Sequence, residues 1–495
     1  MNEDLFSVPK FKKVIVNPSL LELRELARHD EKTTEFGSAS YVGKIRSRSA
    51  RFTKNSVDDS FEREDLEEIA RAKSYLESGG EVIQVDRRIG RAEPFHCRLY
   101  VSKEYARVAL GWAGLLEECS AGEKPDMVTV MVPEWKTVKV LVDAERAFTF
   151  ALGSDYIGEA KKAFLRMWMY LVKKRGWLGL HAGSKLLHLK QGGGSLKRVG
   201  QLFFGLSATG KSTLTGHGFY LGNGEKAELI QDDVVGLKEN AFCMGTEGKG
   251  LFIKTEGLSE KEQPELFHAV RQPSAILENV FVGKDGRVDF TDYSLTSNGR
   301  AVIQRSELSN ASRDIDLEHV DQLFFITRNP LMPPIARLDP RKAAVAFMLG
   351  ESVESSAGDP SKAGQSVRVV GTNPFIMGKR GLEGNRLFEI LSGNPGMECF
   401  ILNTGFVGEG ENATKVRVRD TVGFITGAAR KTINWAFDGE LNLEVPAETI
   451  GSPFDPRTHY SEKEFSERIA RLRRERKEWL ERFPELKPQV KKELY

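Results

Sequence analysis

Apolar and polar residues follow two different patterns along the chain. Up to about residue 176, strand-like runs alternate with amphipathic helical stretches at residues 65–78 and 104–118. The strand-like runs read "EVIQVD", "CRLYVS", "MVTVMV" and "KVLVD". Strands that alternate with helices are typical of an α/β domain. We therefore expect a first domain over residues 1–176.

From about residue 177 the pattern changes to short strands separated by glycine-containing turns. The strand-like runs are "LGLHAGSKLLHLK", "RVGQLFFGLS", "AELIQDD", "GLFIKTEG", "RVDFTD" and "QLFFITRN". Such short runs predict a mixed sheet in a second domain, residues 177–495. The end of this domain, from Ser461 to Tyr495, reads as a charged helix with a frayed tail. Its basic run "RLRRERK" is interleaved with glutamate, which favours a solvated helical face over nucleic-acid binding.

One stretch has little apolar content. Residues 350–366, "GESVESSAGDPSKAGQS", are rich in Gly, Ser and Pro, which is typical of a mobile loop. Composition alone leaves a functional lid and an inert linker equally open.

Composition and charge narrow the class of protein. A chain of 495 residues exceeds the size of a single growing core, so two or three domains are expected. The 72 Lys and Arg nearly balance the 70 Asp and Glu, so no net field attracts nucleic acid or an anionic membrane. The four cysteines are scattered, and the N-terminus has no apolar signal core. With no apolar run long enough to span a bilayer, a cytoplasmic enzyme without membrane or nucleic-acid partners is expected.

The strongest chemical motif is a phosphate loop. The stretch "FFGLSATGKSTLTG" matches the pattern of two glycines, a lysine and a hydroxyl residue between a strand and a helix. The backbone N–H groups of such a loop surround phosphate oxygens, and its lysine reaches the outer phosphates. The predicted nucleotide contacts are Gly205, Leu206, Ser207, Ala208, Thr209, Gly210, Lys211, Ser212, Thr213 and Asp232. Ser212 is also expected to ligate a divalent metal that bridges the phosphates.

Two further features lie on either side of this loop. Downstream, "ELIQDDVVG" ends a strand with the pair Asp232 and Asp233, and one of these carboxylates is expected to reach a nucleotide-bound metal. Adjacent residues of a strand point to opposite faces, so at most one of the two ligates directly. Upstream, Lys161 and Lys162 open an amphipathic helix, and His181 follows a short apolar strand. Taken alone, the lysines read as solvated and the histidine as a core or turn residue.

Taken together, these segments resemble the ATP-dependent phosphoenolpyruvate carboxykinase family. The matching segments, in order, are "YIGEAKK", "GLHAGSK", "FFGLSATGKSTLTG", "LIQDD", "ILENVFVGKDGRVDFTDYSLTSNGR", "PPIARL" and "LNTGFVGEG". The resemblance runs from about Val82 to Phe483. It implies a two-lobed α/β fold with mixed sheets, the phosphate loop in the C-terminal lobe, and a lid at about residues 350–375.

The resemblance also implies a metal site. In the family, Mn²⁺ is held by a neutral lysine amine, a histidine and an aspartate, which correspond here to Lys162, His181 and Asp233. A metal can hold a lysine amine deprotonated because coordination and the proton compete for one lone pair. Mixed nitrogen and oxygen ligands suit Mn²⁺. A second ion, usually Mg²⁺, accompanies the nucleotide at Ser212.

The implied reaction converts oxaloacetate and ATP to phosphoenolpyruvate, CO₂ and ADP. Lys211 and Arg300 are expected to neutralise the migrating phosphoryl group, and Tyr156 and Lys161 to line the carboxylate side. The family also clamps the substrate carboxylate with an arginine from a Gly-Arg-Ser-Pro-Lys-Asp segment. The nearest equivalent here is "GKIRSRSARFTKN", so the candidate clamp is Arg46, with Arg48 and Arg51 as alternatives.

The sequence departs from the family pattern at three places. The arginine segment lacks the proline and the Lys-Asp pair. The histidine segment reads "HAGSK" where the family has His-Cys/Ala-Ser-Ala-Asn. Val422, in "VRVRDTVGF", replaces an arginine that contacts the nucleotide in the family. Adenine and guanine nucleotides, and a monomer or a small homo-oligomer, all remain open at this point.

Two other functions compete with the carboxykinase. A small-molecule kinase on the same fold would phosphorylate a hydroxyl acceptor, and the altered arginine segment favours it. Lys162 and His181 argue against it, because a simple kinase does not need a lysine–histidine metal site. A regulatory nucleotide-binding protein without chemistry is disfavoured by the presence of Lys211, Ser212, Asp233 and Arg300.

Overall fold

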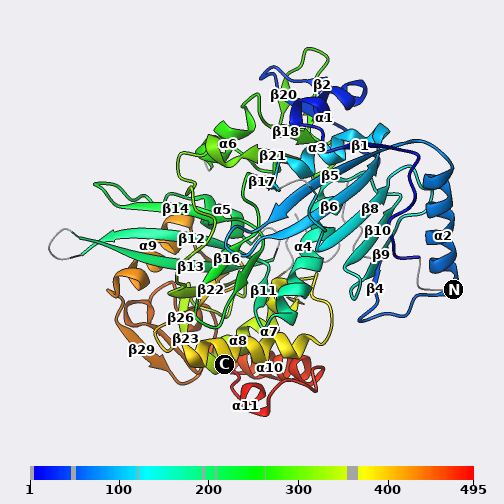
Figure 1. The fold of residues 1–495 in the computed structure, drawn as a ribbon. Helices are drawn as coiled ribbons and strands as arrows, with labels where there is room; N and C mark the ends of the chain where they lie inside the picture. The colour runs from blue at the N-terminus through cyan, green and yellow to red at the C-terminus, as the bar shows by residue number, and fades with distance from the viewer. Residues whose placement is uncertain are drawn as a thin grey trace. The chain divides into compact units, whose positions relative to one another are not determined.

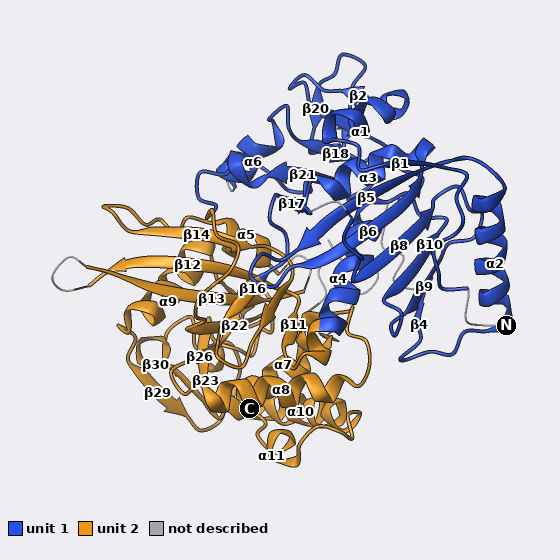
Figure 2. Cartoon of the chain, viewed as in Figure 1, with its two compact units in different colours: residues 1–171, 245–311 blue, residues 172–244, 312–495 orange. Residues whose placement is uncertain are grey.

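The chain forms two compact units. In a computed structural model, the described residues are 5–45, 52–119, 122–191, 195–206, 209–261, 263–353 and 366–495. Unit 1 comprises residues 1–171 and 245–311, and unit 2 comprises residues 172–244 and 312–495 (Figures 1 and 2). This division differs from the single boundary expected at residue 176, because residues 245–311 group with unit 1. Their strand β18 (Ile276–Glu278) pairs in parallel with β3 (Ala39–Tyr41) near the N-terminus.

Unit 1 contains a large mixed sheet, with strand order β1-β5-β6-β8-β10-β9-β4 and β7 beside β5. A second sheet has the order β17-β21-β18-β3-β2, and β19 pairs with β20. The strands are β1 (Lys13–Val16), β2 (Lys32–Thr33), β4 (Thr53–Asn55), β5 (Glu81–Ile89), β6 (Phe95–Ser102), β7 (Glu117–Glu118), β8 (Met127–Val132), β9 (Lys139–Asp143), β10 (Phe148–Leu152), β17 (Gly250–Lys254), β19 (Phe281–Val282), β20 (Val288–Asp289) and β21 (Arg300–Gln304). The helices are α1 (Leu20–Leu26), α2 (Arg63–Ser78), α3 (Ala106–Ala113), α4 (Ile157–Lys174) and α6 (Pro264–Val270). The first segment of unit 1 ends at Leu171, inside α4.

The hydrophobic pattern predicted most of these elements. The four strand-like runs of the first part correspond to β5, β6, β8 and β9, and the helix predicted at 65–78 corresponds to α2. Helix α2 buries Ile69 and Leu76 against Phe150 of the large sheet. The helix predicted at 104–118 is shorter, because α3 ends at Ala113 and Glu117–Glu118 pair with β5. The strands predicted at 250–257 and 287–292 form β17 and β20 of unit 1 and do not join the sheet that precedes the phosphate loop.

Unit 2 is built on a sheet with strand order β14-β12-β13-β22-β26-β23-β30-β29. A small sheet has the order β11-β15-β16, and two hairpins are β24-β25 and β27-β28. The strands are β11 (Leu178–Leu180), β12 (Ala182–Lys190), β13 (Leu196–Phe204), β14 (Lys226–Gln231), β15 (Val235–Leu237), β16 (Cys243–Gly245), β22 (Gln322–Thr327), β23 (Ile335–Leu338), β24 (Glu351–Val353), β25 (Ser366–Arg368), β26 (Glu398–Asn403), β27 (Phe406–Val407), β28 (Thr414–Lys415), β29 (Trp435–Asp438) and β30 (Leu443–Pro446). The helices are α5 (Lys211–Gly216), α7 (Pro340–Leu349), α8 (Arg380–Gly393), α9 (Val418–Arg430), α10 (Glu462–Glu481) and α11 (Pro488–Lys491).

Both faces of the central strands β13, β22 and β26 are largely buried, which explains their apolar runs. Phe203 packs with α9 residues such as Ile425 on one face. Phe204, the next residue of β13, points to the other face and packs in the cluster that holds residues of α7, α8 and α10. In register with Phe203, Phe324 of β22 stacks on it with ring centroids 5.1 Å apart. This packing fixes the end of the strand that leads into the predicted phosphate loop.

The segment predicted as a lid begins and ends in described structure. Glu351–Val353 pairs antiparallel with Ser366–Arg368, and residues 354–365 lie outside the described residues. The C-terminal helix predicted from Ser461 is α10, but its tail is not frayed. Tyr495 is 4% exposed and packs in the main core of unit 2. None of the helices that the structure describes combines the length and the hydropathy needed to cross a membrane.

Candidate functional site

A glycine stands at each end of the loop between β13 and α5, and the described structure gives a reason for both. Gly210 caps α5 with a φ of 97°, in the left-handed region that glycine adopts without strain. A Cβ at Gly205 would lie 2.5 Å from Oγ1 of Thr209, which leaves no room for a side chain. Ser207 and Ala208, two of the predicted phosphate contacts, lie outside the described residues.

Threonine hydroxyls hold the described part of this loop. Oγ1 of Thr209 donates to the main-chain oxygen of Leu206 at 2.7 Å. Oγ1 of Thr404, just after the parallel strand β26, donates to the main-chain oxygen of Thr209, also at 2.7 Å. Thr404 lies in "LNTGFVGEG", a segment that matches the family pattern, but its sequence position alone predicts no role for this hydroxyl.

Three predicted functional side chains meet beside the loop in unit 2. Nε2 of His181 lies 3.0 Å from Oδ1 of Asp233, and Nζ of Lys211 lies 3.3 Å from the same histidine nitrogen. Nζ of Lys211 is also 3.7 Å from Oδ1 of Asp233. Lys211 opens α5, His181 follows β11, and Asp233 lies two residues after the end of β14. Their side chains thus meet although the residues are far apart in the sequence.

The other ring nitrogen of His181 is occupied. Nδ1 lies 2.8 Å from the main-chain oxygen of Thr372. A carbonyl oxygen only accepts hydrogen bonds, so Nδ1 carries the proton. In the neutral imidazole the lone pair then belongs to Nε2, on the side of Asp233, as in a metal-binding histidine with an outer hydrogen-bond partner.

The two adjacent aspartates have different partners, as expected for neighbours on a strand end. Oδ1 of Asp232 accepts a hydrogen bond from Oγ1 of Thr215 in α5 at 3.0 Å, whereas Asp233 faces His181. Asp232 therefore anchors the helix after the loop. Ser212 is exposed and Thr213 is half-buried at the start of α5, so both are accessible to a ligand.

A second group of predicted residues lies in unit 1. Tyr156 precedes α4, Lys161 and Lys162 lie in its first turns, and Arg300 opens β21. Lys161 is buried, and its Nζ lies 2.9 Å from Oε2 of the buried Glu247. The chain pairs an internal lysine with an internal carboxylate, which offsets the cost of burying either charge. The sequence alone did not predict a role for Glu247, because a single glutamate in "MGTEGKG" forms no recognisable motif.

The start of α4 carries an unusual carboxyl. Oε1 of Glu278 accepts a hydrogen bond from the main-chain N–H of Ile157 at 2.7 Å. Glu278 is buried, and burial raises the pKa of this carboxyl to about 8. It therefore holds a proton at neutral pH while still accepting from the helix terminus.

The candidate arginine clamp belongs to the segment that follows Ile45. Arg46, Arg48 and Arg51 lie outside the described residues. Immediately before them, the main-chain N–H groups of Lys44 and Ile45 donate to the two carboxylate oxygens of Asp155, each at 2.9 Å.

Val422, which replaces a family arginine, lies in α9 and is 3% exposed. It packs in the apolar cluster that contains Phe203 and Ile425. Valine suits this buried position because its side chain is apolar. Residue 422 therefore offers no charged group to a nucleotide.

Within the described residues, no group of three or more His, Cys, Asp and Glu side chains could hold a metal ion. The predicted set is different in kind, since it combines one histidine and one aspartate with a lysine amine and a serine hydroxyl. His181 and Asp233 supply its described pair in unit 2, and Lys162 belongs to unit 1.

The fold is mixed α/β, and each of its two units holds one group of the predicted functional side chains. The model of the family described as phosphoenolpyruvate carboxykinase matches residues 12–454. A phosphoenolpyruvate carboxykinase (ATP) from Aeropyrum pernix is 36% identical over 408 residues, which cover 81% of this chain and 81% of that protein. Proteins of the same name from Mesorhizobium japonicum and Rhizobium etli are 28% and 29% identical over 70% and 63% of this chain. These matches span 65% and 57% of the two rhizobial proteins.

The chain therefore belongs to the phosphoenolpyruvate carboxykinase family. It is an ATP-dependent phosphoenolpyruvate carboxykinase-like enzyme, which classes it as a carboxy-lyase that also transfers a phosphoryl group. The small-molecule kinase alternative is not favoured. Membership implies small-molecule substrates, ATP and a divalent metal.

Proposed function

We propose that this chain converts oxaloacetate and ATP to phosphoenolpyruvate, CO₂ and ADP. The observation that carries the proposal is the convergence of Lys211, His181 and Asp233 within 3.7 Å beside the phosphate loop. Unit 2 would be the nucleotide-binding lobe, with residues 205–213 and Asp232 around the phosphates. Unit 1 would be the substrate-side lobe.

The donor set fits a divalent metal. Nδ1 of His181 lies 2.8 Å from the main-chain oxygen of Thr372, so in the neutral imidazole Nε2 can ligate, and a carboxylate oxygen of Asp233 lies 3.0 Å from Nε2. We propose that His181, Asp233 and the amine of Lys162 hold Mn²⁺, and that Ser212 contacts the Mg²⁺ of the nucleotide. When bound, these ions would neutralise negative charge on the substrate oxygen and on the phosphates.

The chain's own residues would act on charge and position. Loss of CO₂ breaks the carbon–carbon bond and leaves its electron pair as an enolate. The enolate oxygen attacks the γ-phosphorus, and the bond to the bridging oxygen breaks with release of ADP. Lys211 would neutralise the charge of the migrating phosphoryl group from the nucleotide side, and Arg300 would do so from the substrate side. Tyr156, Lys161 and Arg46 would orient the carboxylates of oxaloacetate.

The test is turnover of oxaloacetate with ATP, GTP or ITP in the presence of Mn²⁺ and Mg²⁺, with phosphoenolpyruvate and nucleoside diphosphate followed directly. Equal formation of both products is expected, fastest with ATP. His181→Ala should lower kcat/KM by about a hundredfold or more while nucleotide affinity is kept, and Lys211→Ala should lower both.

A matched control is His188→Ala, because His188 lies farther along β12 and pairs with Glu228, away from the loop. This control should turn over like the unchanged protein. Nucleotide binding without phosphoenolpyruvate formation, in either reaction direction, would contradict the proposed function and direct the search to hydroxyl acceptors.

A further inference from the structure

Three of the residues proposed to meet the substrate surround one aromatic ring of unit 1. Nζ of Lys161 lies 5.6 Å from the centroid of the Phe252 ring, and Cζ of Arg300 lies 5.7 Å from the same centroid. The ring of Tyr156 lies 6.1 Å away, centroid to centroid, and is tilted by 57°. Tyr156 and Lys161 lie in one segment of the chain, Phe252 in a second and Arg300 in a third. Their meeting is therefore a product of the fold.

Strand pairing explains part of this arrangement. Phe252 of β17 lies opposite Val302 of β21 in an antiparallel register, and Arg300 is two residues before Val302. Residues two apart on a strand point to the same face, so Arg300 is a diagonal neighbour of Phe252. The sheet register thus brings the guanidinium to the ring.

Other contacts link the same side chains. Nη2 of Arg300 donates to Oδ1 of Asn298 at 2.8 Å, and Nδ2 of Asn298 lies 3.4 Å from the hydroxyl of Tyr156. Lys161 meets Glu247 at 2.9 Å in addition to the ring. The ring of Phe252 contacts Tyr156, Lys161 and Arg300, and its side chain is half-buried.

The physical role of such a ring follows from its charge distribution. Two cations near one another repel, whereas the face of an aromatic ring is negative and attracts a cation within about 6 Å of its centroid. Each cation–ring attraction changes an equilibrium by roughly two- to thirtyfold, and most when the groups are shielded from water. A leucine of similar size would keep the packing and lose this attraction.

We propose that Phe252 is a positioning residue, whose ring holds Lys161, Arg300 and Tyr156 in place for a small dicarboxylate substrate. This inference rests on the proposed function. It adds a neutral residue, which no charge or motif in the sequence marks, to the group that sets substrate affinity.

The test compares Phe252→Leu with Phe252→Tyr under saturating ATP, Mn²⁺ and Mg²⁺. Phe252→Leu should lower kcat/KM for oxaloacetate about tenfold, chiefly by raising KM for oxaloacetate, and should leave KM for ATP within about twofold. Phe252→Tyr keeps the ring face and should recover at least half of the loss. The matched control is Phe242→Leu, which removes a ring 5.4 Å from Nζ of Lys238 in unit 2 and should leave both constants unchanged.

Three outcomes would overturn the inference. They are an unchanged kcat/KM in Phe252→Leu, an equal loss in Phe252→Tyr, and a fall in Tm with KM for ATP rising in parallel. If the unchanged protein forms no phosphoenolpyruvate, the proposed function fails separately. Calorimetric binding of oxalate, a planar dicarboxylate, then tests Phe252: tenfold weaker binding in Phe252→Leu supports the inference, and equal binding overturns it.

Discussion

Nδ1 of His181 lies 2.8 Å from the main-chain oxygen of Thr372, in a turn where Gly371 and Thr372 both have positive φ angles, 59° and 51°. The left-handed conformation of two successive residues aims this oxygen at the imidazole. It thereby selects the tautomer that leaves Nε2 for a metal. The backbone of residues 371–372 is therefore part of the candidate metal site, although neither side chain would touch the metal.

Gly371→Ala should weaken metal binding. A Cβ at residue 371 would lie 2.6 Å from Cζ of Phe347, and alanine resists a φ of 59°, so the turn must shift. We expect the Kd for Mn²⁺ to rise about tenfold or more, as for other outer partners of metal ligands. Calorimetric titration of the nucleotide-free protein with Mn²⁺ measures it. Gly393→Ala, where a Cβ has no neighbour within 4 Å, is the control. Equal affinities in the two variants would contradict this role.

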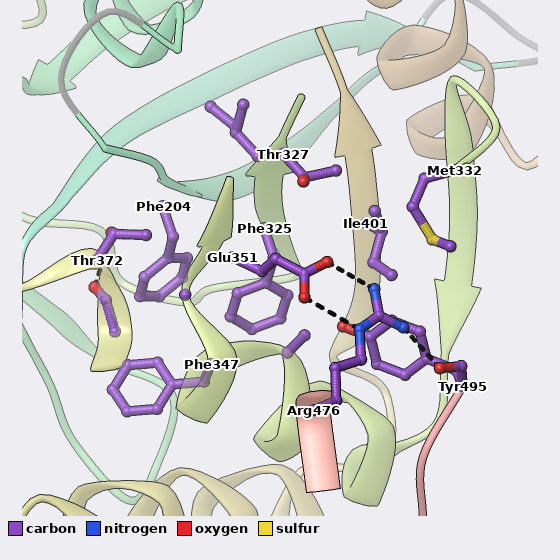
Figure 3. A pocket seen from close by; sticks show the side chains of 14 residues that line it. Phe204, Phe325, Thr327, Met332, Phe347, Glu351, Thr372, Ile401, Arg476 and Tyr495 are labelled. Carbon is purple, nitrogen blue, oxygen red and sulfur yellow. Dashed lines mark hydrogen bonds and ion pairs between the residues drawn. The ribbon is translucent and has the colours of Figure 1, made fainter. Parts of the chain in front are cut away.

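Glu351→Gln should destabilise unit 2 by about 3–5 kcal/mol, the usual cost of stranding a buried charge. Arg476 is 1% exposed, and its Nη2 donates to Oε1 of Glu351 at 2.7 Å (Figure 3). Nη1 of Arg476 donates to the main-chain oxygen of Tyr495 at 2.6 Å. Chemical unfolding measures the loss. The double variant with Arg476→Met should recover part of it, and a double variant as unstable as the single one would contradict the ion-pair explanation.

The same pair predicts acid sensitivity. Burial alone would raise the pKa of Glu351, but the charges of Arg476 and Arg368 outweigh it and lower the pKa to about 2. The unfolded chain binds this proton near pH 4.5, so the stabilisation is complete above that pH and is lost as the pH falls toward 2. Unfolding curves from pH 6 to pH 2 should converge for the unchanged protein and Glu351→Gln. Parallel curves would exclude Glu351 as the source.

Glu278→Gln should stabilise unit 1 at alkaline pH. The native carboxyl has a pKa of about 8 and the unfolded one about 4.5, so the folded state binds more protons between these values and loses stability as the pH rises through them. Among the described residues, Oε2 of Glu278 has no hydrogen-bond partner, which suits a protonated group. Glutamine mimics that form and does not titrate. Its advantage in urea midpoint should grow from pH 5 to pH 8 and then level off.

Lys185→Met should remove a different pH dependence. Lys185 is fully buried in β12, its Nζ donates to the main-chain oxygen of His217 at 2.6 Å, and burial lowers its pKa to about 7. The unfolded lysine keeps its proton to about pH 10.5, so the native state gains stability as the pH rises from 7 to 10.5. The difference in Tm between Lys185→Met and the unchanged protein should shrink over that interval.

Local pattern was enough for the parts of this protein that depend on neighbours in the sequence. Alternation and apolar runs predicted β5, β6, β8, β9 and α2, because a buried strand or helix face needs its own periodicity. The two glycines and the lysine of the phosphate loop stand at fixed spacings because the backbone turn demands them. The motif order along the chain indicated the carboxykinase family, which the comparisons confirmed.

Tertiary structure alone decided the contacts between distant segments. Residues 245–311 joined unit 1 because β18 pairs with β3, and no local signal marks a pairing across more than two hundred residues. Phe252, Glu247 and Thr372 gained their roles the same way, through a ring face, a buried carboxylate and a carbonyl oxygen. Arg476 lies in a helix whose sequence predicts a solvated face, yet its side chain is buried and paired with Glu351. The sequence determines which chemical groups the side chains carry. The strength of the interactions between these groups depends on burial and distance, which arise only when the chain packs.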